Sequence, residues 1–159
     1  MKRKRVWLMS GPPGCGKSTY IQEKLKTEPG VWCSRDKVRF SLIEEGNEYF
    51  SREDEVFQTW INQINDAIAD KKGPADIYVD ATHLTEKARN KTLNLLNLNK
   101  VDIMVVCFDV PVSTCLKRNA KREGLAKVPG NVIKSMCRAY RIPTYKEKYN
   151  YKHITIFQE

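Results

Sequence analysis

The sequence predicts an α/β fold whose mostly parallel sheet is covered by helices on both faces. Short apolar runs of strand-like composition alternate with stretches of helical periodicity along the whole chain, which is the order expected of a parallel sheet. The run 103–108 is continuously apolar, as in a strand buried on both faces. The run 6–10 leads directly into a glycine-rich loop and then a helix-like stretch. Sheets of this kind bind ligands beyond the carboxyl ends of their strands.

Each expected strand is a short run of β-branched, aromatic or other apolar residues. The strands are expected at 6–10, 31–33, 77–80, 103–109 and 154–157. Four small polar or acidic residues fall at the ends of the first four strands: Ser10, Ser34, Asp80 and Asp109. Because the carboxyl ends of parallel strands meet at one edge of a sheet, we expect these four side chains to converge there.

The helices are expected from apolar spacing and from residues that begin or end a helix. They are expected over 19–26, over 34–40, over 52–72, from 85 through the leucines up to 98, from Pro111 through 122, and over 131–140. Ser34 or Asp36 can cap the second helix, and Gly73-Pro74 ends the third. Gly124 and Pro129 flank a loop between the last two helices.

Length and composition are those of one globular domain over 1–159. The chain has 159 residues, of which 41% are hydrophobic and 30% are charged, enough to bury a real core. No apolar run approaches the roughly 20 residues of a membrane span, so we expect no membrane partner. The five cysteines are scattered and lack C-x-x-C spacing, which favours reduced thiols in a cytoplasm over a disulfide framework or a zinc site.

The net charge of +9 lies entirely in the second half of the chain. Residues 1–80 hold 13 Lys and Arg and 13 Asp and Glu, whereas residues 81–159 hold 15 and 6. The segment 117–152 has 11 basic residues against two acidic ones, Glu123 and Glu147. A charge that served solubility alone would be spread more evenly. The asymmetry favours an anionic partner larger than a nucleotide, with nucleic acid the first candidate.

The loop after the first strand matches G-x-x-x-x-G-K-[ST], the phosphate-binding P-loop. Its predicted nucleotide-binding residues are Gly11, Pro12, Pro13, Gly14, Cys15, Gly16, Lys17, Ser18 and Thr19. The glycines let backbone N–H groups turn around an anion, and the dipole of the following helix points at the same place. Lys17 can reach the β- and γ-phosphates of ATP, and the Ser18 hydroxyl can ligate Mg²⁺.

Two acids and one arginine near strand ends are candidates for the chemistry of phosphoryl transfer. Asp36 follows the second strand, where a base could face the γ-phosphate, although it also fits a helix cap. Arg39 lies one turn further on and can clamp a phosphate of the acceptor, or else pair with Glu44 or Glu45 at the surface. Asp80 ends the third strand, where P-loop proteins keep a second acid near Mg²⁺.

Arg118 and Arg122 are four residues apart, so a helix through both would aim two guanidinium groups at one point. Gly124 then loosens the chain. A solvated basic face would explain this pattern in another protein. After a P-loop, the pattern favours a helical lid over about 117–130 that carries arginine fingers.

Several segments, in chain order, resemble the kinase domain of the bacteriophage-type 5′-polynucleotide kinases, members of the P-loop kinase superfamily. The resemblance is carried by 11–19, by Ser34-Arg35-Asp36-x-x-Arg39, by Val79-Asp80-Ala81-Thr82, by 108–111 with 117–122, and by 128–136. It spans nearly the whole chain and implies the P-loop kinase fold. It also implies transfer of the ATP γ-phosphate to the 5′-hydroxyl end of DNA or RNA, as in end repair.

The resemblance assigns a role to each candidate residue. Asp36 is then the general base, Arg39 binds the phosphate of the acceptor, and Lys17 and Ser18 hold phosphate and Mg²⁺. Arg122 stabilises the transferring group from the lid, Asp80 orients Arg122, and Arg118 assists. Thr82 would contact the acceptor. Some relatives carry a fused phosphatase domain with an Asp-x-Asp-Gly-Thr motif, which this sequence lacks, so phosphatase activity is not expected.

Two other functions fit parts of the sequence. A P-loop kinase of a small metabolite or nucleotide-sugar would need no wide basic field, and a nucleotide-dependent switch would leave Asp36, Arg39 and the lid arginines without a task. Thr82-His83 departs from many relatives, which have asparagine nearby. His83 and His153 fit ordinary polar surface residues rather than ligands. Cys15 fits a tolerated small residue, or a thiol activated at a helix N-terminus.

Overall fold

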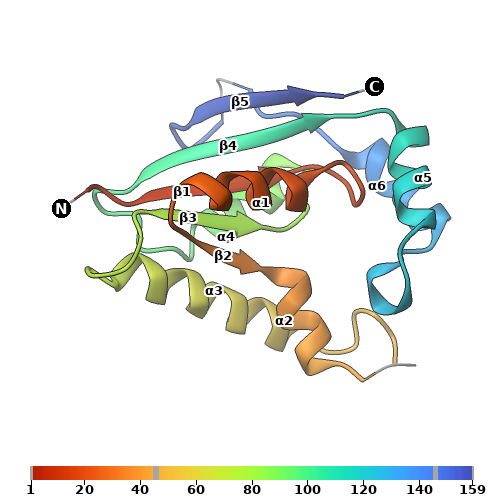
Figure 1. Ribbon diagram of the computed structural model, residues 1–159, viewed down its shortest axis with the longest axis horizontal. Helices are drawn as coiled ribbons and strands as arrows, with labels where there is room; N and C mark the ends of the chain where they lie inside the picture. Colours follow the sequence, from red (N-terminus) through yellow and green to blue (C-terminus); the bar gives the residue numbers. More distant parts are fainter. Residues whose placement is uncertain (1, 45–46, 145–146, 159) are drawn as a thin grey trace.

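The computed structural model describes residues 2–44, 47–144 and 147–158 (Figure 1). Five strands form one sheet in the order β2-β3-β1-β4-β5, and every neighbouring pair is parallel. They are β1 (Arg5–Ser10), β2 (Gly30–Ser34), β3 (Asp76–Asp80), β4 (Asp102–Asp109) and β5 (Lys152–Phe157). The predicted α/β class and the five expected strands are confirmed.

In the described part of the chain, six α-helices connect and cover the strands. They are α1 (Lys17–Thr27), α2 (Arg35–Leu42), α3 (Glu53–Ala69), α4 (Glu86–Leu93), α5 (Val112–Ala120) and α6 (Gly130–Ala139). A short 3-10 turn, η1 (Gly124–Ala126), follows α5. Ser34 begins α2 as expected, because its Oγ accepts a hydrogen bond from the backbone N–H of Lys37 at 3.2 Å.

Three helices end earlier than the sequence predicts. One of them, α3, ends at Ala69 rather than at Lys72, because the backbone leaves the helical conformation at Asp70. The prediction that α4 continues through Leu98 is wrong, because the chain turns after Leu93 and is held there by the side chain of Asn65 on α3. That amide donates to Leu95 O at 3.0 Å and accepts from the N–H of Asn97 at 2.9 Å. The prediction that α5 continues through Arg122 is also wrong, because it ends at Ala120.

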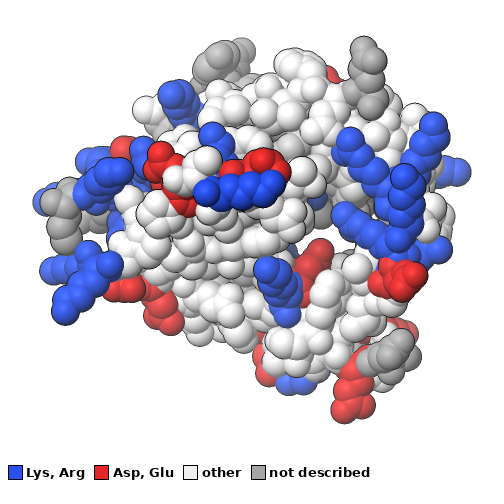
Figure 2. Space-filling view, in the orientation of Figure 1, with Lys and Arg blue, Asp and Glu red and all other residues white. Residues whose placement is uncertain are grey.

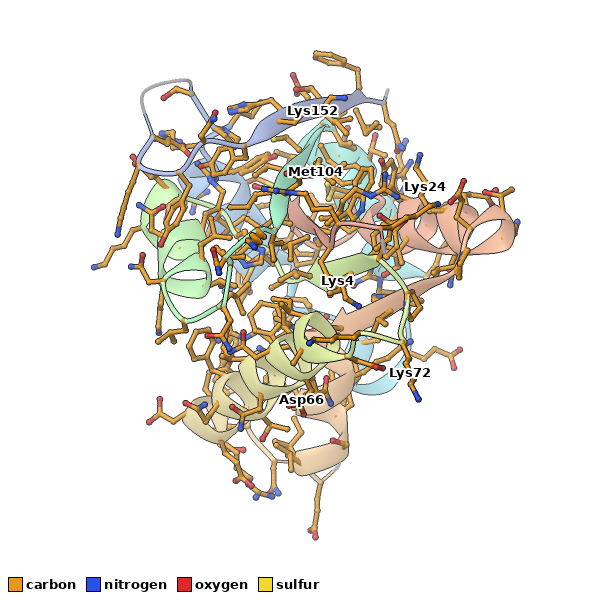
Figure 3. All side chains as sticks on the ribbon, turned by 90° about the vertical axis from the view of Figure 1, so that its left-hand side faces the viewer. Lys4, Lys24, Asp66, Lys72, Met104 and Lys152 are labelled. Atoms are coloured by element: carbon orange, nitrogen blue, oxygen red, sulfur yellow. The ribbon has the colours of Figure 1, made fainter. Side chains whose placement is uncertain are left out.

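The sheet separates two apolar clusters, one on each face. Alternate residues of one strand therefore belong to different clusters: Leu8 of β1 packs with Trp60 and Ile64 of α3, whereas Met9 packs with Ile21 of α1. Cys115 of α5 and Ile133 of α6 belong to the cluster of α1, and Leu93 of α4 belongs to that of α3. Figure 3, which looks along the strands, shows α1 and α4 on opposite sides of the sheet.

The amino ends of the strands are tied together by charges. The side chain of Lys4 points to the end of α3 (Figure 3), where its Nζ donates to Asp70 O at 2.7 Å and to Pro74 O at 2.8 Å. Because helix C-termini carry partial negative charge, an ammonium there stabilises the helix end. This edge of the sheet thus serves stability.

The carboxyl ends of the strands meet at the opposite edge. The register places Ser34 beside Asp80 and Ser10 beside Cys107, whereas Asp109 lies two residues further along β4, beside Phe157. The strand ends therefore meet at one edge, as predicted, and convergence of all four side chains stays a prediction. The loop after β1, the start of α2, and α5 with the segment that follows it all lie at this edge (Figure 1). In the part of the chain that the structure describes, no helix is both long and apolar enough to cross a bilayer.

Candidate active site

The P-loop joins β1 to α1 in a conformation that glycine makes possible. Gly14 has φ +82° and Gly16 has φ +112°, both in the left-handed region that other residues rarely adopt. A Cβ atom on Gly14 would lie 2.7 Å from the backbone oxygen of Cys115 in α5. The loop therefore packs directly against the backbone of α5.

Gly14→Ala is expected to destabilise the protein and to weaken nucleotide binding. The left-handed backbone alone costs about 1–2 kcal/mol for alanine, and the contact with Cys115 adds to that cost. Gly124→Ala is the matched control, because Gly124 has φ +60° and its Cβ would meet nothing within 4 Å. Thermal unfolding and the Kd for ATP measure both effects. Equal losses in the two variants would show that the contact with α5 is not what requires glycine at position 14.

The start of α1 is open to an anion. Gly16 takes the N-cap position without a side-chain hydrogen bond, and the first turn holds no acidic residue. Ser18 and Thr19 are exposed, whereas Pro12 and Cys15 are buried. Lys17 Nζ donates to the loop's own carbonyl oxygens, Gly11 O at 2.8 Å and Pro12 O at 3.0 Å. The ammonium of Lys17 thus lies at the opening of the loop. A bound phosphate would replace these carbonyl oxygens as the hydrogen-bond acceptor of the ammonium.

The residues of this edge suit Mg²⁺ that arrives with a nucleotide. Mg²⁺ in such sites is held by one or two protein oxygens, by phosphate oxygens and by water. In the P-loop, the exposed hydroxyl of Ser18 is a protein oxygen that could bind Mg²⁺ in this way. Within the described residues no group of three His, Cys, Asp or Glu side chains forms a metal site of its own.

Asp80 lies at the end of β3, within electrostatic reach of two candidate catalytic groups. It is 8% exposed, and its Oδ2 accepts a hydrogen bond from Trp32 Nε1 at 3.0 Å. Burial raises the pKa of Asp80, the positive charge of Lys17 opposes that rise, and the negative charge of Asp36 adds to it. The charges of Lys17 and Asp36 therefore both influence the carboxyl group of Asp80. The P-loop and the start of α2 thus lie near the same strand end.

Asp36 and Arg39 form an ion pair one helical turn apart at the start of α2. Arg39 is 5% exposed, and its Nε and Nη2 also donate to the carboxylate of Glu53 at 3.1 and 2.7 Å. Tyr49 Oη accepts from Arg39 Nη1 at 3.1 Å and donates to Asp36 Oδ1 at 2.9 Å. Arg39 is thus a buried anchor rather than a surface partner of Glu44, and Glu45 lies outside the described residues. These bonds use four of the five N–H groups of the guanidinium, so the predicted contact with an acceptor phosphate would use the second N–H of Nη2 or replace one of these bonds.

Glu53 and Tyr49 are site residues that the sequence does not indicate. Burial by itself would raise the pKa of Glu53, but the hydrogen bond and the charge of Arg39, with the charge of Arg35, lower it. Burial, together with the negative charge of Asp36, raises the pKa of Tyr49. Tyr49 therefore keeps its proton, and this proton is the one that it donates to Asp36. The carboxylate of Asp36 is thus held in place while its side chain remains 56% exposed.

Arg118 reaches the P-loop from α5. Its Nη1 donates to Gly14 O at 3.1 Å and its Nη2 donates to Gln158 Oε1 at 2.7 Å. Arg122 follows the end of α5, is half-buried, and uses its backbone N–H to bond Asn119 O at 3.0 Å. The two arginines therefore do not share a helical face. Among the described residues, the hydrogen-bond donor to the Asp80 side chain is Trp32, so the Asp80–Arg122 pairing stays a prediction.

The base of the predicted lid is closed by the side chain of Asn119. Its Nδ2 donates to Val128 O at 2.6 Å, and its Oδ1 accepts from the N–H of Val128 at 2.9 Å. Asn119 is 4% exposed. The residues between them, including Arg122 and η1, form a loop whose two ends are held together. The predicted lid is thus anchored at both ends, and its movement over the P-loop stays a prediction.

The loop after β3 is bonded to the P-loop through its backbone. Thr82 O accepts from the N–H of Gly11 at 2.8 Å, and His83 O accepts from Ser10 Oγ at 2.7 Å. His83 is 4% exposed, so its assignment to the surface is wrong. Its Nδ1 bonds Met9 O at 2.8 Å, its Nε2 bonds Thr92 Oγ1 at 2.9 Å, and burial lowers its pKa to about 3. A neutral His83 therefore fixes the loop that presents Thr82.

Residues 6–143 match the family model described as an AAA domain. The chain belongs to this family. The AAA domain is similar in structure to a chain of the Pnkp1/Rnl/Hen1 RNA repair complex, with a TM-score of 0.70 and 21% identity over 87% of this chain and 44% of that one. It therefore spans less than half the length of that relative.

Two further relatives match almost the whole AAA domain. A sugar kinase from Janibacter sp. HTCC2649 has a TM-score of 0.63 and 17% identity over 98% of this chain and 86% of that one. A fungal RNA kinase has a TM-score of 0.64 and 13% identity over 98% and 74%. At these identities the likenesses establish a shared fold. The fold of this AAA domain is that of the P-loop kinases, as expected from the sequence.

Proposed function

We propose that this AAA domain is a polynucleotide kinase that transfers the γ-phosphate of ATP to the 5′-hydroxyl end of DNA or RNA. The observation that carries the proposal is the exposed carboxylate of Asp36, fixed by Arg39 and Tyr49 at the edge of the sheet that holds the P-loop (Figure 1). A nucleotide switch needs no such carboxylate, whereas a kinase needs one to orient and deprotonate its acceptor hydroxyl. The RNA kinase and RNA repair relatives support the polynucleotide as acceptor.

The proposed reaction uses groups from three sides of one phosphate. Lys17 and the N–H groups of the loop bind the β- and γ-phosphates, and Mg²⁺ at Ser18 would neutralise charge on their oxygens. The 5′-oxygen forms a bond to the γ-phosphorus while the bond from that phosphorus to the bridging oxygen breaks, and ADP leaves. Asp36 accepts the proton of the 5′-hydroxyl. Arg122 neutralises the transferring group from the lid side.

The charge distribution supports a polyanionic acceptor. Figure 2 shows Lys and Arg side chains gathered over α5 and the segment that follows it. The basic residues of this part of the chain include Lys117, Lys121 and Lys127, all exposed. A strand that enters with its 5′ end at Asp36 would carry its next phosphates through this positive field. A small uncharged acceptor would gain nothing from it.

The second candidate is a kinase of a small metabolite or nucleotide-sugar. It is favoured by the sugar kinase, because the match covers nearly all of both chains. The two candidates share the P-loop, Asp36 and the lid. They differ in what fills the space between α2 and the basic segment.

One labelling experiment separates these functions. The protein is incubated with Mg²⁺ and γ-labelled ATP, together with a 5′-hydroxyl oligonucleotide, a 5′-phosphorylated control or a pool of sugars and nucleotide-sugars. Label on the 5′-hydroxyl oligonucleotide alone is the expected result. Label on a component of the pool would favour the second candidate. Bound ATP with neither label nor released phosphate would identify a nucleotide-dependent switch.

A further inference from the structure

An exposed aromatic ring stands next to the proposed base. Phe50 is 54% exposed and packs edge-to-face on Tyr49, with ring centroids 4.7 Å apart and planes at 82°. Tyr49 in turn donates its hydroxyl proton to Asp36. Phe50 is therefore separated from the carboxylate of Asp36 by a single tyrosine ring, and much of its surface is left to solvent.

The position of both rings is set by buried charge. The guanidinium carbon of Arg39 lies 4.5 Å from the ring centre of Tyr49 and 5.4 Å from that of Phe50. Phe40 packs edge-to-face on Tyr49 from α2, at 6.2 Å. Arg39 is held by Glu53, so the pair of rings rests on a fixed base. Rings that are ordered before a ligand binds lose little entropy on binding.

An exposed aromatic ring offers apolar surface that a ligand can cover. The hydrophobic contribution from covering such a ring is left unused in the free protein. Apart from Phe50, Phe157 is the other phenylalanine exposed to this degree, at 74%, and it lies on β5, at the opposite edge of the sheet from β2 and α2. Phe50 thus stands out by its place beside the proposed base.

We propose that Phe50 is the stacking platform for the terminal nucleobase of the acceptor. This inference rests on the proposed function and deepens it. When a 5′-hydroxyl points at Asp36, the base of the same nucleotide is the nearest flat, apolar group of the acceptor, and Phe50 is an exposed ring that packs on the tyrosine bonded to Asp36. Stacking on an aromatic ring is tolerant of sequence, because every base has a π-face. The platform would therefore accept all four terminal bases and would reject an acceptor without one.

The test compares two oligonucleotides that differ only at the 5′ end: one begins with an ordinary nucleotide and the other with an abasic 5′-hydroxyl residue. For the unchanged protein, kcat/KM should favour the base-bearing end by roughly 5- to 150-fold, the range measured for single stacked bases. Phe50→Ala should remove most of that preference while kcat/KM for the abasic end and the Kd for ATP stay unchanged. Phe50→Trp should keep the preference, and Phe50→Leu, which retains apolar bulk without a π-face, should lose it.

Phe157→Ala is the matched control and should keep the full preference for the base-bearing end. A Phe50→Ala protein with the preference of the unchanged protein would overturn the inference and leave the proposed function intact. A Phe50→Leu protein with full preference would do the same, since apolar contact would then suffice. Failure of the unchanged protein to label either oligonucleotide would overturn the proposed function, and this inference with it.

Discussion

Asp36→Asn should abolish phosphoryl transfer while ATP still binds. The amide has nearly the shape of the carboxylate but cannot take the proton of the acceptor hydroxyl. A positioned general base contributes roughly 10²–10⁴ in rate, so kcat should fall by about that factor. The ion pair with Arg39 is lost as well, but Arg39 keeps both bonds to Glu53, so the fold should hold. Single-turnover transfer from labelled ATP to a 5′-hydroxyl oligonucleotide, with the Kd for ATP, measures both expectations.

Two further variants separate proton transfer from the loss of local charge. Asp54→Asn removes an exposed carboxylate from the first turn of α3 and should leave transfer unchanged. Tyr49→Phe keeps Asp36 but removes the hydroxyl that donates to it at 2.9 Å. Because that bond fixes the carboxylate without performing chemistry, this variant should lose far less than Asp36→Asn. Normal transfer by Asp36→Asn would show that the base lies elsewhere.

The sequence was informative wherever one short segment decides the structure. The P-loop glycines, the cap at Ser34 and the apolar run of β4 depend on neighbours within a few residues, so their patterns predict them directly. The parallel sheet follows from the alternation of such segments. The strand ends then converge by geometry, so the positions of Asp36 and Asp80 just at or after strand ends predict a shared edge for both.

What the sequence missed depends on contacts between distant segments. No spacing rule in the sequence connects Arg39 with Glu53 or Tyr49. The ion pair between Arg39 and Glu53 forms only when α2 packs against α3, and Tyr49 lies between these two helices in the sequence. His83 is buried because the loop after β3 packs against β1, where His83 Nδ1 donates a hydrogen bond to Met9 O. The turn after Leu93 is imposed by Asn65 from another helix. Tertiary contacts override local periodicity in each case.

The early end of α5 changes what is expected of the two lid arginines. Arg118 already lies on the P-loop, bonded to Gly14 O and held from behind by Gln158. Arg122 lies beyond the helix, in the loop that Asn119 and Val128 close. Charge on the transferring phosphate develops only during the reaction. An arginine on a lid that closes at this stage can neutralise that charge, and the closed lid also excludes water. We therefore expect Arg118 to serve nucleotide binding and Arg122 to serve the transferring phosphate.

Arg122→Ala should lower kcat by roughly 10³-fold or more, the range for loss of an arginine finger, with little change in the KM for ATP. Arg118→Ala should instead raise the KM for ATP, because it removes a guanidinium that touches the P-loop backbone. Lys121→Ala removes a neighbouring exposed charge and should affect only the salt dependence of oligonucleotide binding. Steady-state kinetics with ATP and a 5′-hydroxyl oligonucleotide at two salt concentrations distinguishes the three variants. If Arg122→Ala changed only KM and Arg118→Ala only kcat, the finger would be the arginine on the helix, and the lid would have no part in stabilising the transferred phosphate.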